Sequence, residues 1–304
     1  MRGFGIGRFF VDSIKEFWGS LETFFFRPSG AEVLAWIRIA TGAMIAYIHL
    51  VWLLRLESFF GPRALLDYES LSMLHRNVWK WTYLDGRESL WLACLHEVLA
   101  LGAGLAMALG LWTRWTVPAA WFLTLMTAHR LAPFLFGLDQ IVLMLAMYLS
   151  VSRCGDAWSL DQRFGIVQGP VLHWQNTFAT RLIQLHLCVI YFFGGLGKAR
   201  GWMWWDGTAM WYAAASYEYQ SLDWTWIGRY ATLGSILTHG TLFWEIAYAA
   251  LVWPRLTRPW ILAIAFFVHA GIALFMGMIT FGLMMLVANL AFVRLPDPRC
   301  DTSS

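Results

Sequence analysis

The stretch Tyr191-Phe-Phe-Gly-Gly-Leu-Gly-Lys-Ala-Arg-Gly-Trp202 closes a strongly apolar run with three glycines and a lysine. Counting back from the lysine in steps of three and four gives a set of polar or small residues that share one face of a helix. This polar stripe consists of Arg181, Gln184, Cys188, Tyr191, Gly195 and Lys198. The pattern predicts a membrane helix with one polar face, and an ionisable residue at membrane depth marks a candidate functional site.

The composition is that of an integral membrane protein with an all-α fold. Of the 304 residues, 59% are hydrophobic and only 13% are charged, whereas soluble domains carry about 25% charged residues. The net charge of +3 includes no basic run, so no nucleic-acid partner is expected. The four cysteines, Cys94, Cys154, Cys188 and Cys300, form no CxxC pair, and no metal site is predicted.

The apolar runs divide the chain into three parts. Residues 1–28 place apolar side chains at helical spacing and predict an amphipathic helix in the membrane interface. Residues 29–294 form the predicted transmembrane domain, and residues 295–304 form a C-terminal tail. Runs long enough to cross a hydrocarbon core of roughly 30 Å predict a bundle of about eight transmembrane helices. The predicted spans are 33–54, 90–112, 115–129, 134–152, 180–197, 231–253 and 260–292, the last divided in two near residues 276–280 at Gly277 and Gly282.

The distribution of basic residues predicts the orientation. With eight spans, twelve basic residues fall on the side of the two termini and nine on the other side. Because cytoplasmic loops carry an excess of Lys and Arg, both termini are expected in the cytoplasm. Lys198 would then lie near the outer side of the membrane.

Four charged residues fall at membrane depth: Arg38, Glu97, Lys198 and Glu245. One interpretation is that internal ion pairs fix the helix packing, with Arg38 bound to Glu97, Glu245 or the shallower Asp139. Glu97 also belongs to a predicted packing seam of small residues. The members of this seam are Ala93, Glu97, Ala100, Gly104 and Ala108.

The functional interpretation concerns Lys198, Tyr191 and His269, which we predict to line one cavity with Glu245 nearby. His269 is the one titratable group in the charge-free run 260–292. The alternatives are that Lys198 extends to the interface from a helix end and that His269 is a packing residue.

Several segments carry a resemblance to a known family. They are Leu34-Ala-Trp-Ile-Arg38-Ile, Phe136-Gly-Leu-Asp-Gln140, Ala157-Trp-Ser-Leu-Asp161, Tyr191 to Lys198, Trp202 to Gly207, Phe243-Trp-Glu-Ile246 and His269-Ala-Gly-Ile-Ala-Leu274. Over roughly residues 25–293 the chain resembles the horizontally transferred transmembrane domain, the membrane domain of vitamin K-dependent γ-glutamyl carboxylases.

The resemblance implies an enzyme that activates a vitamin K-type hydroquinone or another quinol. It places Lys198 as the catalytic base, and we expect His269 to be a second catalytic residue. The residues expected to bind the quinol are Tyr191, Gly194, Gly195, Glu245 and Trp202. Gly197 stands where the carboxylases have the first of two lysines, and no large lumenal domain is expected. We therefore expect quinol activation rather than carboxylation of peptide glutamate.

The expected partners are the lipid bilayer, a lipophilic small molecule and, from the resemblance, a peptide or protein substrate. A second functional class remains open, a non-catalytic membrane partner that binds a quinone or lipid. A transporter ranks third, because the sequence lacks an evident pair of repeats with broken helices.

Overall fold

The structure, a computed structural model, describes residues 6–62, 64–66, 68–74, 79–85, 89–169 and 171–293. Over these residues it is all-helical, with 77% helix and no strand. The predicted tail 295–304, with Cys300, and the first five residues of the predicted interfacial segment lie outside the described residues.

Each of the eight segments predicted as spans forms a helix. These helices are α2 (Glu32–Leu54), α5 (Leu90–Leu109), α6 (Thr113–Arg130), α7 (Gly137–Ser150), α9 (Trp174–Ala199), α12 (Ala231–Leu251), α13 (Arg258–Phe275) and α14 (Ile279–Asn289). Four of them, α2, α5, α9 and α13, are long and apolar enough to cross a membrane. The helix α7 and the stretch Ile279–Phe292 are apolar but shorter.

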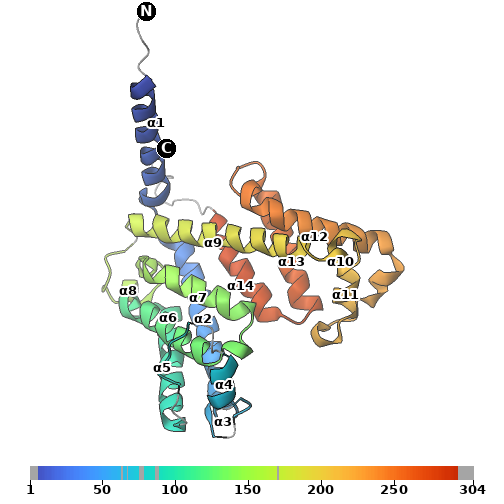
Figure 1. Cartoon of the computed structure of the whole chain (residues 1–304). Coiled ribbons are helices and arrows are strands. Elements are labelled where there is room, and N and C mark those ends of the chain that lie inside the picture. The colour runs from blue at the N-terminus through green and yellow to red at the C-terminus, as the bar shows by residue number, and fades with distance from the viewer. Residues whose placement is uncertain are drawn as a thin grey trace, which may run out of the picture.

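The remaining elements are the long N-terminal helix α1 and several short helices and turns. They are α1 (Ile6–Phe26), α3 (Leu56–Phe60), α4 (Tyr68–Leu74), α8 (Leu160–Arg163), α10 (Trp202–Trp205), α11 (Ala209–Ala215) and the 3-10 turns η1 (Ala132–Phe134), η2 (Cys154–Asp156), η3 (Tyr217–Tyr219), η4 (Thr225–Arg229) and η5 (Leu290–Phe292). In Figure 1, α1 projects from the body, while α9 and α12 cross it together. The predicted N-terminal helix therefore exists as α1, and its interfacial position stays a prediction.

The most extensive helix contact joins α2 to α5. A Cβ built on Gly42 would lie 2.5 Å from the backbone nitrogen of Ala108, and one on Gly104 would lie 2.8 Å from that of Ala46. Glycines are therefore required here, because the two backbones touch directly. The contact confirms the predicted seam of small residues on α5.

The last apolar run is divided as predicted. Helix α13 ends at Phe275 and α14 begins at Ile279, and between them Gly277 has φ +69°. The prediction was wrong for Gly282, which lies inside α14 rather than at the break. A Cβ on Gly282 would lie 2.5 Å from the carbonyl oxygen of His269, so this glycine lets α14 pack closely on α13.

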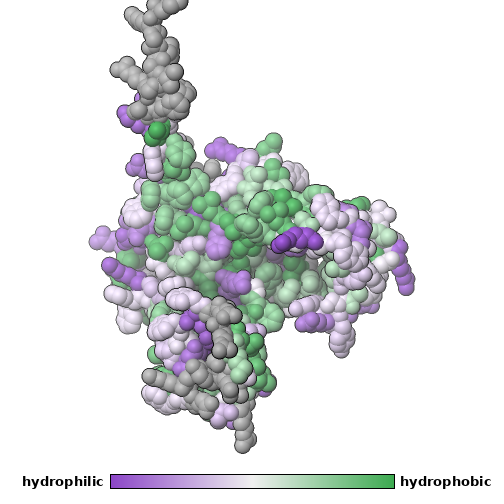
Figure 2. Space-filling model, in the orientation of Figure 1, coloured by the Kyte–Doolittle hydropathy of each residue, from purple (hydrophilic) through white to green (hydrophobic). Residues whose placement is uncertain are grey.

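The outer surface of the body is apolar. Figure 2 shows a broad hydrophobic area across its middle. On α9 the outward side chains Leu185, Val189 and Phe193 are 37%, 51% and 63% exposed. Exposed apolar surface of this extent is rare on soluble monomers, and it fits a lipid bilayer around the helices.

Candidate functional site

The polar stripe of α9 faces the protein interior. Gln184, Cys188, Tyr191 and Gly195 are buried together with Ile183 and Leu187, whereas Leu185, Val189, Phe193 and Leu196 are exposed. The sequence pattern therefore identified the correct inner face of this helix. Its two ends, Arg181 and Lys198, are half-buried.

At the C-terminal end of the stripe, Lys198 forms an ion pair with Glu245 of α12. Lys198 Nζ lies 3.0 Å from Glu245 Oε1 and 2.8 Å from Oε2. The Lys198 side chain is 32% exposed and that of Glu245 is 11% exposed, so ligands can reach the lysine. Sequence reasoning named both residues but did not pair them.

Gly195 brings the two charges together. A Cβ on Gly195 would lie 2.7 Å from Ile246 Cγ1 and 3.1 Å from Glu245 Cβ. The glycine therefore permits the close approach of α9 to α12, one turn before Lys198. We predicted it as a quinol-binding residue, but the structure fills the space above it with α12. At Gly194 a Cβ would lie 3.6 Å from Glu245 Oε2, an ordinary contact.

An indole ring lies beside the ion pair, but it is not the predicted one. Lys198 Nζ is 5.6 Å from the centroid of the Trp204 ring, within the range of a cation–π interaction. Trp202, the predicted ligand residue, is 64% exposed and packs against Tyr212. Both tryptophans belong to the four-residue helix α10, and the aromatic run Trp-Met-Trp-Trp does not show which ring turns inward.

Two turns before Lys198, Tyr191 contacts His269. The Tyr191 hydroxyl lies 2.6 Å from His269 Nε2 and accepts a hydrogen bond from Asn289 Nδ2 at 2.9 Å. Asn289 Oδ1 in turn accepts a hydrogen bond from the Tyr248 hydroxyl at 2.6 Å. The Tyr191 ring packs against two aromatic rings of α12. Its centroid lies 4.0 Å from that of Tyr248 and 5.1 Å from that of Trp244.

Sequence reasoning missed Asn289 and Tyr248. Asn289 is a polar residue inside the last apolar run, and that signal was present in the sequence. His269 Nδ1 is buried and makes no hydrogen bond to any residue that the structure describes.

Two cavities open among the described residues, and neither is lined by Lys198, Tyr191 or His269. The larger one, of about 550 Å³, is lined by Arg181 and Gln184, at the opposite end of the polar stripe. The separation from Lys198 is about 25 Å along the helix. The shared cavity at Lys198 therefore stays a prediction, although the contacts of Lys198 with Glu245 and of Tyr191 with His269 are formed.

The predicted ion pair of Arg38 is replaced by a backbone contact. Arg38 is fully buried, and its Nη2 donates a 2.7 Å hydrogen bond to the carbonyl oxygen of Trp158. No carboxylate of a described residue forms a salt bridge with it. Gly110, with φ +71°, leaves the space that the guanidinium occupies, because a Cβ there would lie 1.8 Å from Nη1.

The acidic residues proposed for Arg38 have other partners. Asp139 Oδ2 accepts a 2.8 Å hydrogen bond from the backbone N–H of Phe136, at the start of its own helix α7. Glu97 is fully buried between α2, α5 and α6. Its Oε2 lies 2.6 Å from His49 Nδ1, and its Oε1 accepts a hydrogen bond from Thr127 at 3.1 Å.

The contacts of Glu97 extend into a buried polar network. His96 Nε2 lies 2.7 Å from the Thr127 hydroxyl, and His96 Nδ1 meets the hydroxyl of Tyr83. Tyr83 lies outside the spanning helices, where burial, and secondarily the charge of Glu97, raise its pKa. The phenol therefore stays protonated. This network joins three helices and the connection before α5.

Among the described residues, no group of three or more His, Cys, Asp or Glu side chains is arranged to hold a metal ion. In comparisons with known proteins, no family model, curated protein or solved structure matches the chain.

Proposed function

We propose that this protein is a membrane enzyme that binds a quinol-type lipophilic molecule and accepts a proton from it at Lys198. The proposal follows from the resemblance to vitamin K-dependent carboxylases. The observation that supports it most is the half-buried ion pair of Lys198 with Glu245, at the inner face of a helix long enough to span a membrane.

The ion pair supplies a route to a neutral amine. A lysine accepts a proton only in its neutral form. In the pair, the ammonium group can transfer its proton to the Glu245 carboxylate, which leaves an amine and a carboxylic acid. The amine then takes the proton of a quinol hydroxyl and leaves a quinolate, so the charge on the site is conserved at each step.

Aromatic and polar groups around the pair suit a flat, polar-edged ring. Trp204 offers an indole face beside Lys198. The buried Nδ1 of His269, on the neighbouring helix α13 beside Tyr191, offers a second hydrogen-bonding atom. The quinolate is then oxidised to the quinone with added dioxygen as the two-electron acceptor, and this oxidation is what quinol turnover means in the tests below. Carboxylation of a peptide glutamate is not part of the proposal.

Mass spectrometry of ligands extracted from the purified protein tests the proposal. We expect a quinone to copurify with the wild-type protein and the added quinol to be turned over. The variant Glu245→Gln should retain the quinone but lose turnover, because it removes the proton acceptor for Lys198. Absence of any quinone, together with no binding of added quinol, would contradict the proposal.

A second candidate function is that of a non-catalytic quinone- or lipid-binding partner of other membrane proteins. The neutralised charge of Lys198 and the closed network around Tyr191 favour it, because both also occur in purely structural contacts. Copurification of a quinone without turnover of any quinol would select this function.

The proposed orientation places both termini in the cytoplasm and Lys198 near the outer side, as the distribution of basic residues predicts. A reporter fused after Ser304 that is active only in the cytoplasm should be active. The same reporter inserted after Glu218, in the connection beyond Lys198, should be inactive. Activity with the opposite pattern would reverse the topology.

A further inference from the structure

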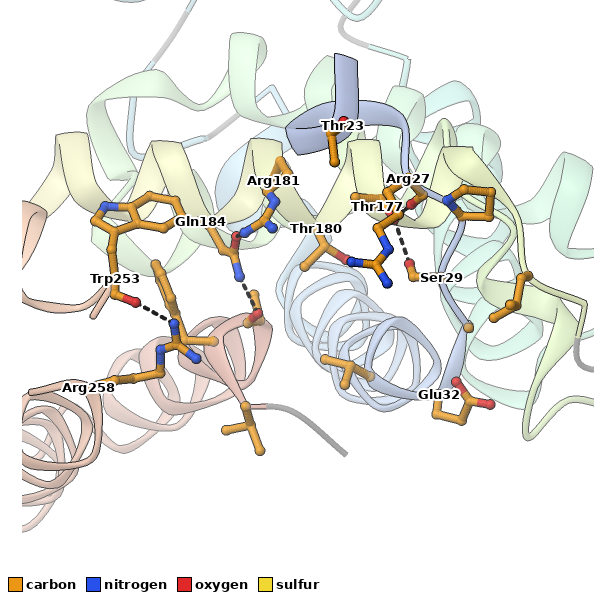
Figure 3. A pocket seen from close by; sticks show the side chains of 17 residues that line it. Thr23, Arg27, Ser29, Glu32, Thr177, Thr180, Arg181, Gln184, Trp253 and Arg258 are labelled. Carbon is orange, nitrogen blue, oxygen red and sulfur yellow. Dashed lines mark hydrogen bonds between the residues drawn. The ribbon is translucent and has the colours of Figure 1, made fainter. Parts of the chain in front are cut away.

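The larger cavity, about 550 Å³ in volume, lies where several helix ends meet (Figure 3). Its lining comes from the end of α1 and the link to α2, the first turns of α9, the connection between α12 and α13, and η5. In a membrane protein such helix ends and connections lie at the level of the lipid headgroups. The cavity is independent of the proposed quinol site.

The charge of the cavity is positive. Three arginines, Arg27, Arg181 and Arg258, and one acid, Glu32, contribute the charged side chains of its lining. The formal excess is two positive charges. Helices α2 and α13 also begin at this cavity, and the N-terminal ends of helices favour anions. The cavity therefore suits a negatively charged group.

Neighbouring groups hold Arg181 in place. Its Nε donates to the carbonyl oxygen of Phe24 at 3.1 Å, and its Nη1 donates to Gln184 Oε1 at 2.8 Å. Its guanidinium carbon lies 4.2 Å from the centroid of the Phe24 ring. Gln184 is itself fixed by a 2.7 Å hydrogen bond to the carbonyl oxygen of Ala291. These contacts fix the position of the Arg181 charge at the cavity, so little side-chain freedom remains to be lost when an anion binds nearby.

Arg258 is held by the end of the preceding helix. Its Nε donates to the carbonyl oxygen of Val252 at 3.0 Å, and its Nη2 donates to that of Trp253. Arginine side chains bind phosphate oxygens through two parallel hydrogen bonds. On the opposite wall, Thr177 donates a 2.8 Å hydrogen bond to the Ser29 hydroxyl. These two hydroxyl groups add hydrogen-bonding groups that suit phosphate oxygens.

An apolar cavity continues from the positive one. The second cavity, about 320 Å³, shares Arg258, Phe292 and Val293 with the first. It extends to Pro259 and Leu262 of α13, and Arg255 is the second arginine of its otherwise apolar lining. A charged pocket beside an apolar groove matches a molecule with a phosphate joined to a hydrocarbon chain. We infer that the two cavities bind an anionic phospholipid, with its phosphate among the three arginines and an acyl chain along α13 at Leu262.

Native mass spectrometry of the delipidated protein in a neutral detergent tests the inference with three probes. We expect phosphatidylglycerol to bind at least fivefold more tightly than zwitterionic phosphatidylcholine. Glycerol 3-phosphate is the water-soluble probe without an acyl chain. At equal concentration it should not displace phosphatidylglycerol, because it has no chain to occupy the second cavity.

Variants locate the site. Arg27→Gln and Arg258→Gln should each weaken phosphatidylglycerol binding about fivefold, the effect of one basic residue near an anionic lipid. The matched control Arg163→Gln changes an exposed arginine outside both cavities and should leave binding unchanged. Arg27 is also exposed, so its variant reports on binding even if Arg258→Gln unfolds.

Equal binding of the two lipids, or an equal loss in Arg27→Gln and Arg163→Gln, would overturn the inference. Displacement by glycerol 3-phosphate would also overturn it, and would assign the cavity to a soluble phosphate ester.

Discussion

Lys198→Arg is expected to abolish quinol turnover while the protein stays folded. Arginine keeps the charge that pairs with Glu245, but it stays protonated and cannot act as a base. Since a positioned base contributes about 10²–10⁴-fold to a rate, the rate of quinol turnover should fall by at least about 10²-fold. The measurement is quinol consumption by the purified variant, with the thermal unfolding midpoint as the check on folding.

The chain offers a matched control for this substitution. Lys80 forms an ion pair with Asp85 at 3.3 Å in the connection before α5, so Lys80→Arg makes the same chemical change in another lysine–carboxylate pair. It should leave turnover unchanged. Lys198→Ala should be inactive and partly restored by a small added amine. Full activity in Lys198→Arg would refute the role of Lys198 as a base.

Glu97→Ala is expected to lower the free energy of unfolding by about 2–6 kcal/mol, because two buried groups each lose a hydrogen-bond partner at a cost of about 1–3 kcal/mol. The substitution removes the partner of His49 Nδ1 and the acceptor of the Thr127 hydroxyl in the core of α2, α5 and α6. Glu97→Gln keeps the shape and one acceptor oxygen, so its effect should be smaller. The measurement is the unfolding midpoint in detergent micelles.

Glu218→Ala provides the comparison for Glu97, because this glutamate is exposed on η3. It should change the midpoint little, as surface substitutions usually do. If Glu97→Ala and Glu218→Ala had the same unfolding midpoint, the buried network would contribute nothing measurable to stability.

The sequence predicted the helical segments well because apolar runs and their interruptions are local properties. The break near Gly277 followed from the length of the apolar run 260–292, and the inner face of α9 followed from the spacing of its polar and small residues. How many segments cross the membrane did not, since α6 and α12 are helical but fall outside the four that are long and apolar enough.

The partners of the charged residues could not be predicted in the same way. Depth in the membrane suggested that Arg38 meets a carboxylate, yet its acceptor is the backbone carbonyl of Trp158, and every residue has such a group. Which partners Glu97 and Glu245 contact depends on how each neighbouring helix is oriented about its own axis. That orientation depends on close contacts such as the one at Gly195, which only the three-dimensional packing reveals.

The contact of α2 with α5 also determines how these helices can move. With backbone against backbone at Gly42 and Gly104, a shift of α2 along α5 by one turn, about 5.4 Å, would place the Cβ of Arg38 or Ala46 where Gly42 now lies. Sliding is therefore sterically blocked, and the two helices share one fixed register.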